Sequence, residues 1–128
     1  MVSIGDFPFT GTGLGSFRQV TRRLYPLNVQ ADYDIAHAHN IFFQVALDIG
    51  LPGLIAYLAI LIIAGAVGWQ VAKQDERLRP LALGLLAGLA ALHIYGLTDA
   101  LALGSKTSIT FWVALGLLTA MHQMVQER

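Results

Sequence analysis

The chain has 128 residues, of which 55% are hydrophobic and 12% are charged, and its mean hydropathy is +0.61. Soluble domains carry about 25% charged residues, so this composition excludes an ordinary soluble domain. Eight basic residues balance eight acidic ones, which excludes the positive surface typical of nucleic-acid-binding proteins. The chain contains no cysteine, so disulfides, thiolate zinc sites and cysteine-bound iron–sulfur clusters are excluded as well.

Residues 1–35 are polar and rich in glycine, proline and aspartate, which predicts a loop region. Within it, Gly11-Thr12-Gly13-Leu14-Gly15 permits positive φ angles and close approach by a ligand. The third glycine of a dinucleotide fingerprint is missing, and no Gly-Lys-Ser/Thr follows to make a phosphate-binding P-loop. A plain glycine turn and a loop that approaches a ligand both stay open.

Three arginines follow this glycine stretch, at Arg18, Arg22 and Arg23. If residues 17–25 are helical, Arg18 and Arg22 share one face before Pro26 ends the helix. One interpretation is a cationic surface beside lipid headgroups. The other is an anion clamp, because a guanidinium group can bind two phosphate oxygens at once. The arginines alone favour neither.

Polar side chains recur at helical spacing in residues 36–50, which predicts a short amphipathic helix. The stripe consists of His37, Asn40, Gln44 and Asp48. Such a helix is expected to lie at the membrane interface or to pack over a cavity. The segment Gly50-Leu51-Pro52-Gly53 is expected to break it.

Three stretches without Asp, Glu, Lys or Arg follow, at residues 49–72, 80–98 and 107–126. A helix needs about 20 residues to cross the hydrocarbon core of a bilayer. We therefore predict an all-α integral membrane protein, in which an extracytoplasmic loop (1–35) and the short amphipathic helix (36–50) precede a three-helix transmembrane region (51–128). The spans are expected at about 54–72, 81–103 and 109–125, the last with Trp112 as an interfacial anchor.

The basic residues of the connecting loops predict the orientation. Lys73, Arg77 and Arg79 lie between the first two predicted spans, whereas only Lys106 lies between the second and the third. The positive-inside rule places the 73–79 loop and the C-terminus in the cytoplasm. Residues 1–50 then face outward.

Four histidines and one aspartate are the further candidates for chemistry. Asp99 falls near the outer end of a predicted span, where an ionised group is costly, so we expect a functional or paired role; the alternative is a helix-end carboxylate that reaches water or Lys106. His37 and His39 are too close in sequence for the two-histidine metal pattern of a helix, and no metal or other cofactor is expected. A histidine at the membrane boundary suits proton transfer, or is simply solvated there. His93 is expected to bond a neighbouring helix and His122 to have no chemical role.

The run His37-Ala38-His39-Asn40-Ile41-Phe42-Phe43-Gln44, continuing to Gly50-Leu51-Pro52-Gly53-Leu54, resembles the O-antigen ligase / O-antigen polymerase family of bacterial membrane proteins. That family has a His-Asn pair, a short spacer and Gly-x-x-Gly at the start of a membrane helix. His39-Asn40 matches the pair, and Gly50 with Gly53 matches the glycines. Upstream, Gly13-Leu14-Gly15-Ser16-Phe17 looks like the family's glycine stretch, and Arg23 with Leu27 is similar to its Arg-x-x-x-Leu element. The resemblance covers residues 11 to about 103.

The resemblance implies transfer of a glycan from an undecaprenyl-diphosphate carrier to an acceptor hydroxyl in cell-surface polysaccharide synthesis, without nucleotide sugar or metal. It implies a multi-pass protein of the bacterial inner membrane with its site facing the periplasm, in contact with membrane lipids. By the same resemblance His39 is the catalytic residue. Arg23, with Arg18 or Arg22, would hold the diphosphate, and His37 and Asn40 would orient His39 or the sugar. We count Asp99 among the substrate-binding candidates.

Full members of that family are several times longer, so we expect this chain to be a C-terminal portion that needs the missing N-terminal transmembrane part and has little activity alone. A non-catalytic membrane subunit or remnant remains an alternative, in which the motif persists without chemistry. A small transporter component is the third possibility, and for it Asp99 and His93 would matter more than His39. The motif does not separate ligase from polymerase.

Overall fold

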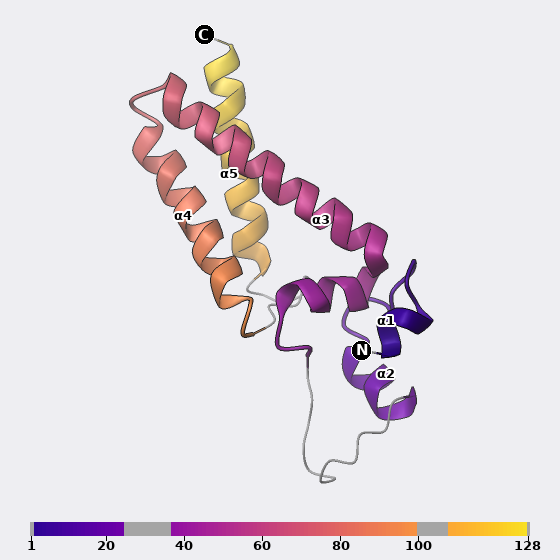
Figure 1. Cartoon of the computed structure of the whole chain (residues 1–128). Coiled ribbons are helices and arrows are strands. Elements are labelled where there is room, and N and C mark those ends of the chain that lie inside the picture. The colour runs from indigo at the N-terminus through magenta and orange to yellow at the C-terminus, as the bar shows by residue number, and fades with distance from the viewer. Residues whose placement is uncertain (1, 25–36, 100–107, 128) are drawn as a thin grey trace.

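The computed structural model describes residues 2–24, 37–99 and 108–127, and this part of the chain is helical without strands (Figure 1). The helices are α1 (Val2–Asp6), α2 (Phe17–Leu24), α3 (Ile41–Gln74), α4 (Arg79–Tyr95) and α5 (Ser108–Gln126). The predicted all-α class is confirmed.

Two of these helices, α3 and α5, are long and apolar enough to cross a membrane, whereas α4 is a shorter apolar helix of 17 residues. Only 17% of the most apolar stretch of α3 and 22% of that of α5 is buried within the protein. Large apolar side chains such as Ile55, Ile62 and Ile109 are therefore exposed. A core helix of a soluble protein buries its apolar residues, so this pattern indicates surfaces that face lipid or further helices.

Helix α3 begins later than the sequence pattern predicted. Asn40 is its N-cap, with extended backbone (φ −159°, ψ 124°), and its side-chain oxygen accepts hydrogen bonds from the backbone N–H groups of Phe42 and Phe43. His39 has a φ of 50°, a left-handed conformation that an α-helix cannot contain. The predicted helical start at 36–40 is therefore wrong for residues 37–40, which form a turn; Ala36 lies outside the described residues.

Gly50 divides α3 into two parts that run in different directions. Its φ of 74° and ψ of −180° interrupt the helical backbone, and Pro52 follows in the first turn of the second part, where its missing N–H costs least. In Figure 1 the first part crosses beneath the helical bundle before the chain turns sharply into the long second part. The predicted break at Gly50 is confirmed as a kink between two joined helical segments.

The end of α4 also differs from the prediction. The helix was expected to run over 81–103, but it ends at Tyr95, and residues 96–99 form turns. There the backbone N–H groups of Leu97 and Thr98 donate to the carbonyls of Ile94 and Tyr95, each three residues back, which tightens the chain out of the α-helical path. Residues 100–107 lie outside the described part. They include Lys106 and all of the predicted 104–108 turn except Ser108.

The two parts of the bundle core lie between α3 and its neighbours α4 and α5. The larger cluster consists of Ile41, Val45, Tyr57, Ala64, Leu89, Phe111 and Leu118. Gly68 allows α3 to approach α4, because an added Cβ there would lie 2.7 Å from the Leu86 side chain. As expected, His93 bonds a neighbouring helix: its Nε2 lies 2.8 Å from the Tyr57 hydroxyl of α3.

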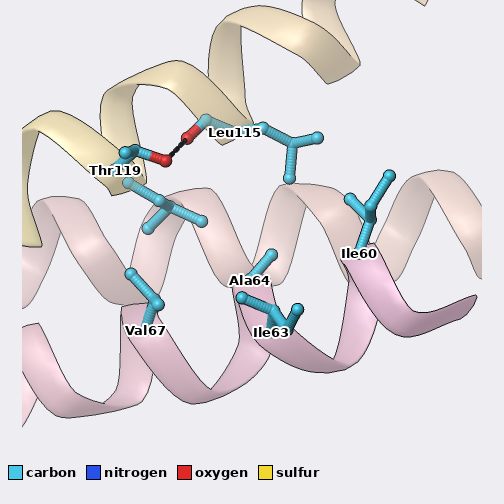
Figure 2. A pocket seen from close by; sticks show the side chains of 7 residues that line it. Ile60, Ile63, Ala64, Val67, Leu115 and Thr119 are labelled. Carbon is cyan, nitrogen blue, oxygen red and sulfur yellow. Dashed lines mark hydrogen bonds between the residues drawn. The ribbon is translucent and has the colours of Figure 1, made fainter. Parts of the chain in front are cut away.

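An apolar groove of about 200 Å³ separates part of α3 from α5 (Figure 2). Its walls are formed by Ile60, Ile63, Ala64 and Val67 of α3 and by Leu115, Leu118 and Thr119 of α5. The Thr119 hydroxyl donates to the Leu115 carbonyl of its own helix, so its polarity is satisfied locally and the groove stays apolar.

The bundle has two chemically different ends (Figure 1). The charged α3–α4 turn and the C-terminal end of α5 lie at one end, whereas α1, α2 and the beginning of α3 lie at the other. The elements that carry the candidate site residues before α4 therefore lie at the end opposite the α3–α4 turn.

Candidate functional site

His37, His39 and Asp99 meet at the beginning of α3, although Asp99 is about 60 positions further along the chain. The Nδ1 atom of His37 lies 3.5 Å from the Asp99 Oδ1 atom, and that of His39 lies 4.0 Å from it. The two imidazole rings are 4.5 Å apart. The His39 side chain is 64% exposed, against 29% for His37 and 37% for Asp99, so His39 is the one most open to a substrate. We refer to these three residues as the His–Asp cluster.

Two hydrogen bonds bring the Asp99 turn to the histidine turn. The Ile41 N–H donates to the Gly96 carbonyl at 2.7 Å, and the Asn40 side-chain amide donates to the Leu97 carbonyl at 3.2 Å. Gly96 is required for this contact, because an added Cβ would lie 2.8 Å from the Ile41 side chain. Asn40 therefore has two structural roles, since it caps α3 with its oxygen and holds the end of α4 with its nitrogen.

Tyr95 completes the surroundings of Asp99. Its hydroxyl donates a 2.8 Å hydrogen bond to the Oδ2 atom of Asp99, while the Oδ1 atom faces the two histidines. A carboxylate that is held by one oxygen and presents the other to an imidazole can orient the ring and stabilise its protonated form. The chemistry that this arrangement supports is proton transfer at an exposed histidine.

The glycine stretch is held against the kink of α3. The N–H groups of Thr12 and Gly13 donate to the carbonyls of Leu47 and Asp48 at 2.7 and 3.0 Å, so the loop satisfies carbonyls that the kink removes from the helical ladder. An added Cβ at Gly11 would lie 2.5 Å from the Asp48 backbone, and one at Gly50 would lie 2.5 Å from the Phe9 carbonyl oxygen. Both glycines also have positive φ angles.

These contacts explain two of the motif glycines and add one. Gly50 and Gly13 take part in the joint, and so does Gly11, which was not among the four motif glycines and whose backbone approach is as close as that of Gly50. Gly15 has open space around its α-carbon, and an added Cβ at Gly53 would overlap the Ile49 side chain one turn earlier. The glycine stretch is thus a backbone joint to α3.

A buried polar chain runs along the first part of α3. The Ala38 N–H donates to the side-chain oxygen of Gln44, and the Gln44 amide donates to the Asp48 Oδ1 atom, both at 2.9 Å. Gln44 and Asp48 are 3% and 1% exposed, and the Gly15 N–H lies close to the Asp48 carboxylate. The predicted polar stripe therefore faces the protein and links the histidine turn to the glycine loop.

The three arginines lie on α2, directly after the glycine loop, and all three are exposed. The loop joins α3 at Asp48, eight residues after Asn40, which at 1.5 Å per residue is about 12 Å along the helix axis. The prediction that residues 1–35 form a loop region is wrong for α1 and α2. The helix Phe17–Leu24 meets the condition under which Arg18 and Arg22 share one face. Tyr25, Pro26 and Leu27 lie outside the described residues.

The structure adds residues that sequence reasoning missed. Tyr95, Gly96 and Gln44 carry contacts of the site, and only Gln44 gave a signal, through its place in the polar stripe. His93 lies in an aromatic cluster with Phe42 and Phe111, apart from the His–Asp cluster. In the described part, the ligand atoms of His37, His39 and Asp99 form one group within 4.8 Å of one another.

Comparison with known proteins finds a match to the first part of the chain. The family model described as O-antigen ligase matches residues 1–58, which include the glycine loop, α2, both site histidines and the kink of α3. No curated protein and no solved structure matches the chain. The apolar helices and this match together indicate a ligase-type membrane enzyme. Residues 1–58 of this chain are therefore similar to the O-antigen ligase family.

Proposed function

We propose that the chain takes part in transfer of a glycan from undecaprenyl diphosphate to an acceptor hydroxyl at the outer face of the bacterial inner membrane. In the reaction the acceptor oxygen bonds to the anomeric carbon of the glycan, and the bond from that carbon to the diphosphate oxygen breaks. Undecaprenyl diphosphate leaves, and the hydroxyl proton passes to a base. The observation that carries the proposal is the exposed His39 beside Asp99, in a chain whose first part is similar to the O-antigen ligase family.

His39 is the base in this proposal. Its Nδ1 atom is on the side of Asp99, so its Nε2 atom is the one available to an acceptor hydroxyl. Proton uptake creates an imidazolium, and the nearby carboxylate stabilises this charge. His37 and Asn40 support the turn, through the ring contact with His39 and the bonds to α3 and α4.

The arginines of α2 bind the diphosphate. The leaving group gains negative charge as its bond to the glycan breaks, and preorganised guanidinium groups stabilise such charge. Arg18 and Arg22 share a helical face, and Arg23 adjoins them. The glycine loop that precedes this helix joins α3 at Asp48, about 12 Å along the helix axis from Asn40. A donor that extends from diphosphate to sugar can occupy that length.

The proposal is tested in the strain that carries the gene. We expect His39→Ala to abolish attachment of the glycan, seen as loss of the polysaccharide ladder on a gel of surface material, while the variant protein stays at its normal level in the membrane. His122→Ala is the matched control, because it removes an imidazole from α5, and we expect it to keep the ladder. An unchanged ladder in the His39→Ala strain, or in a strain without the gene, contradicts the proposal and favours a non-catalytic remnant.

The two proposed roles have different signatures in membrane preparations. Asp99→Asn removes the charge that stabilises the imidazolium, so we expect the rate to fall at saturating donor, with the apparent affinity for donor little changed. Arg23→Ala weakens the hold on the diphosphate, so we expect a higher donor concentration for half-maximal rate, partly restored by Arg23→Lys. Equal effects of both variants on both quantities would contradict the separate roles.

A further inference from the structure

The His–Asp cluster contains three atoms that are all electron-pair donors. His37 and His39 point their Nδ1 atoms at the same Asp99 Oδ1 atom, and ligand atoms of all three residues lie within 4.8 Å of one another. One metal ion placed among these atoms would be bound by all three residues.

One distance in the His–Asp cluster matches the spacing of ligands around a bound zinc ion, and all three pairs of ligand atoms lie within 4.8 Å. Tetrahedral ligands at about 2.0–2.1 Å from zinc are about 3.3 Å apart. The His37–Asp99 pair, at 3.5 Å, already has this spacing. The His39–Asp99 pair, at 4.0 Å, needs a contraction of about 0.7 Å to reach it, which rotation of the exposed His39 side chain can provide.

The ligand types and their support fit a transition-metal ion such as zinc. Two imidazoles and one carboxylate are ligands of zinc, whereas calcium and magnesium prefer oxygen alone. Tyr95 donates to the second oxygen of Asp99 at 2.8 Å, the kind of outer hydrogen bond that fixes a ligating carboxylate. The exposure of His39 leaves room for water as the fourth ligand.

We propose that His37, His39 and Asp99 form a binding site for one zinc(II) ion at the end of the bundle that carries α1 and α2. The sequence argument against a metal site rested on the short spacing of the histidines, and the fold adds a carboxylate from position 99. The bound ion coordinates the imidazole ring of His39. If the proposed glycan transfer holds, the ion inhibits it, and this consequence rests on the proposed function.

Binding is tested on the full, tag-free chain in detergent, with cobalt(II) as a coloured substitute and zinc(II) as its competitor. We expect visible absorption bands of four-coordinate cobalt at one equivalent, lost when one equivalent of zinc is added. His37→Ala and Asp99→Asn should each weaken zinc binding at least tenfold. The control is His122→Ala, which should bind as the unaltered chain does. Circular dichroism shows that each variant keeps its helices.

Tyr95→Phe is a second variant that keeps all three ligands. It removes only the hydrogen bond to Asp99 and should weaken zinc binding about tenfold, as loss of an outer-shell partner does. Absence of the cobalt bands in the unaltered chain, or equal zinc affinity in the Asp99→Asn and unaltered chains, overturns the site.

Inhibition is measured separately in membranes that transfer glycan. Zinc should stop transfer and a chelator should restore it. Continued transfer at zinc concentrations that saturate the site overturns the inhibitory consequence while binding stands. Absence of transfer in every condition is a failure of the proposed function and leaves the binding result unaffected.

Discussion

Replacement of Gly50 by alanine is expected to detach the glycine loop from α3. The φ of 74° and ψ of −180° at this position belong to a region that is essentially restricted to glycine. The added Cβ would lie 2.5 Å from the Phe9 carbonyl oxygen and 3.0 Å from the Gly11 backbone nitrogen. Neither atom belongs to a flexible side chain, so the loop or the kink has to move.

The magnitude follows from the contacts that this movement breaks. Strained backbone of this kind costs about 1–3 kcal/mol. Three backbone hydrogen bonds cross the joint, from Thr12 to Leu47, from Gly13 to Asp48 and from Leu51 to Pro8, and at about 1 kcal/mol each they contribute about 3 kcal/mol. The chain adopts whichever response costs less, the strained backbone or the broken hydrogen bonds. The free energy that holds the loop on α3 should therefore fall by about 3 kcal/mol, which raises the undocked population about 100-fold.

Hydrogen exchange followed by mass spectrometry measures this population. We expect peptides that cover residues 7–16 to lose protection about 100-fold in Gly50→Ala. Gly88→Ala is the matched control, because an added Cβ at Gly88 meets nothing within 4 Å and alanine favours the helix. Equal protection of the 7–16 peptides in the Gly50→Ala and unaltered chains would refute the backbone joint.

Three further predictions concern the polar chain, the bundle interior and the orientation. Gln44→Leu leaves the Ala38 N–H and the Asp48 carboxylate without their buried partner, so the free energy of unfolding in mixed detergent should fall by about 1–3 kcal/mol. An unchanged unfolding midpoint would contradict the stabilising role of this buried polar chain. Tyr57→Phe removes the hydroxyl that bonds His93 and should cost about 0.6–1.7 kcal/mol, measured in the same assay, with no loss of stability as the contrary result. A cysteine in place of Thr10 should react with an impermeant reagent in intact cells and one in place of Glu76 should not; the reverse pattern contradicts the outward orientation of the site.

The local features of the site were predictable because they depend on neighbours in the chain. Asn40 is a strong N-cap residue before an apolar run, and its cap is present, although the predicted start of the helix was several residues too early. The glycine-rich segment after Ile49 predicted the break, which is a kink at Gly50. The pattern could not place the end of α4, because residues 96–99 leave the helix to bond Asn40 and Ile41, which lie more than 50 residues earlier.

The sequence by itself determined that this is a helical protein of apolar surfaces, with a His-Asn pair near the start of one helix and a glycine break ten residues after Asn40. Periodicity, capping and composition depend on residues that are close together in the chain, so they can be read from the amino-acid sequence. Only the tertiary structure decided that Asp99 joins His37 and His39, that Gly11 and Gly50 interlock, and that Gln44 and Asp48 are buried. These contacts depend on how α3, α4 and the glycine loop pack in three dimensions, and helical spacing alone does not specify which distant residue fills the space beside a given side chain.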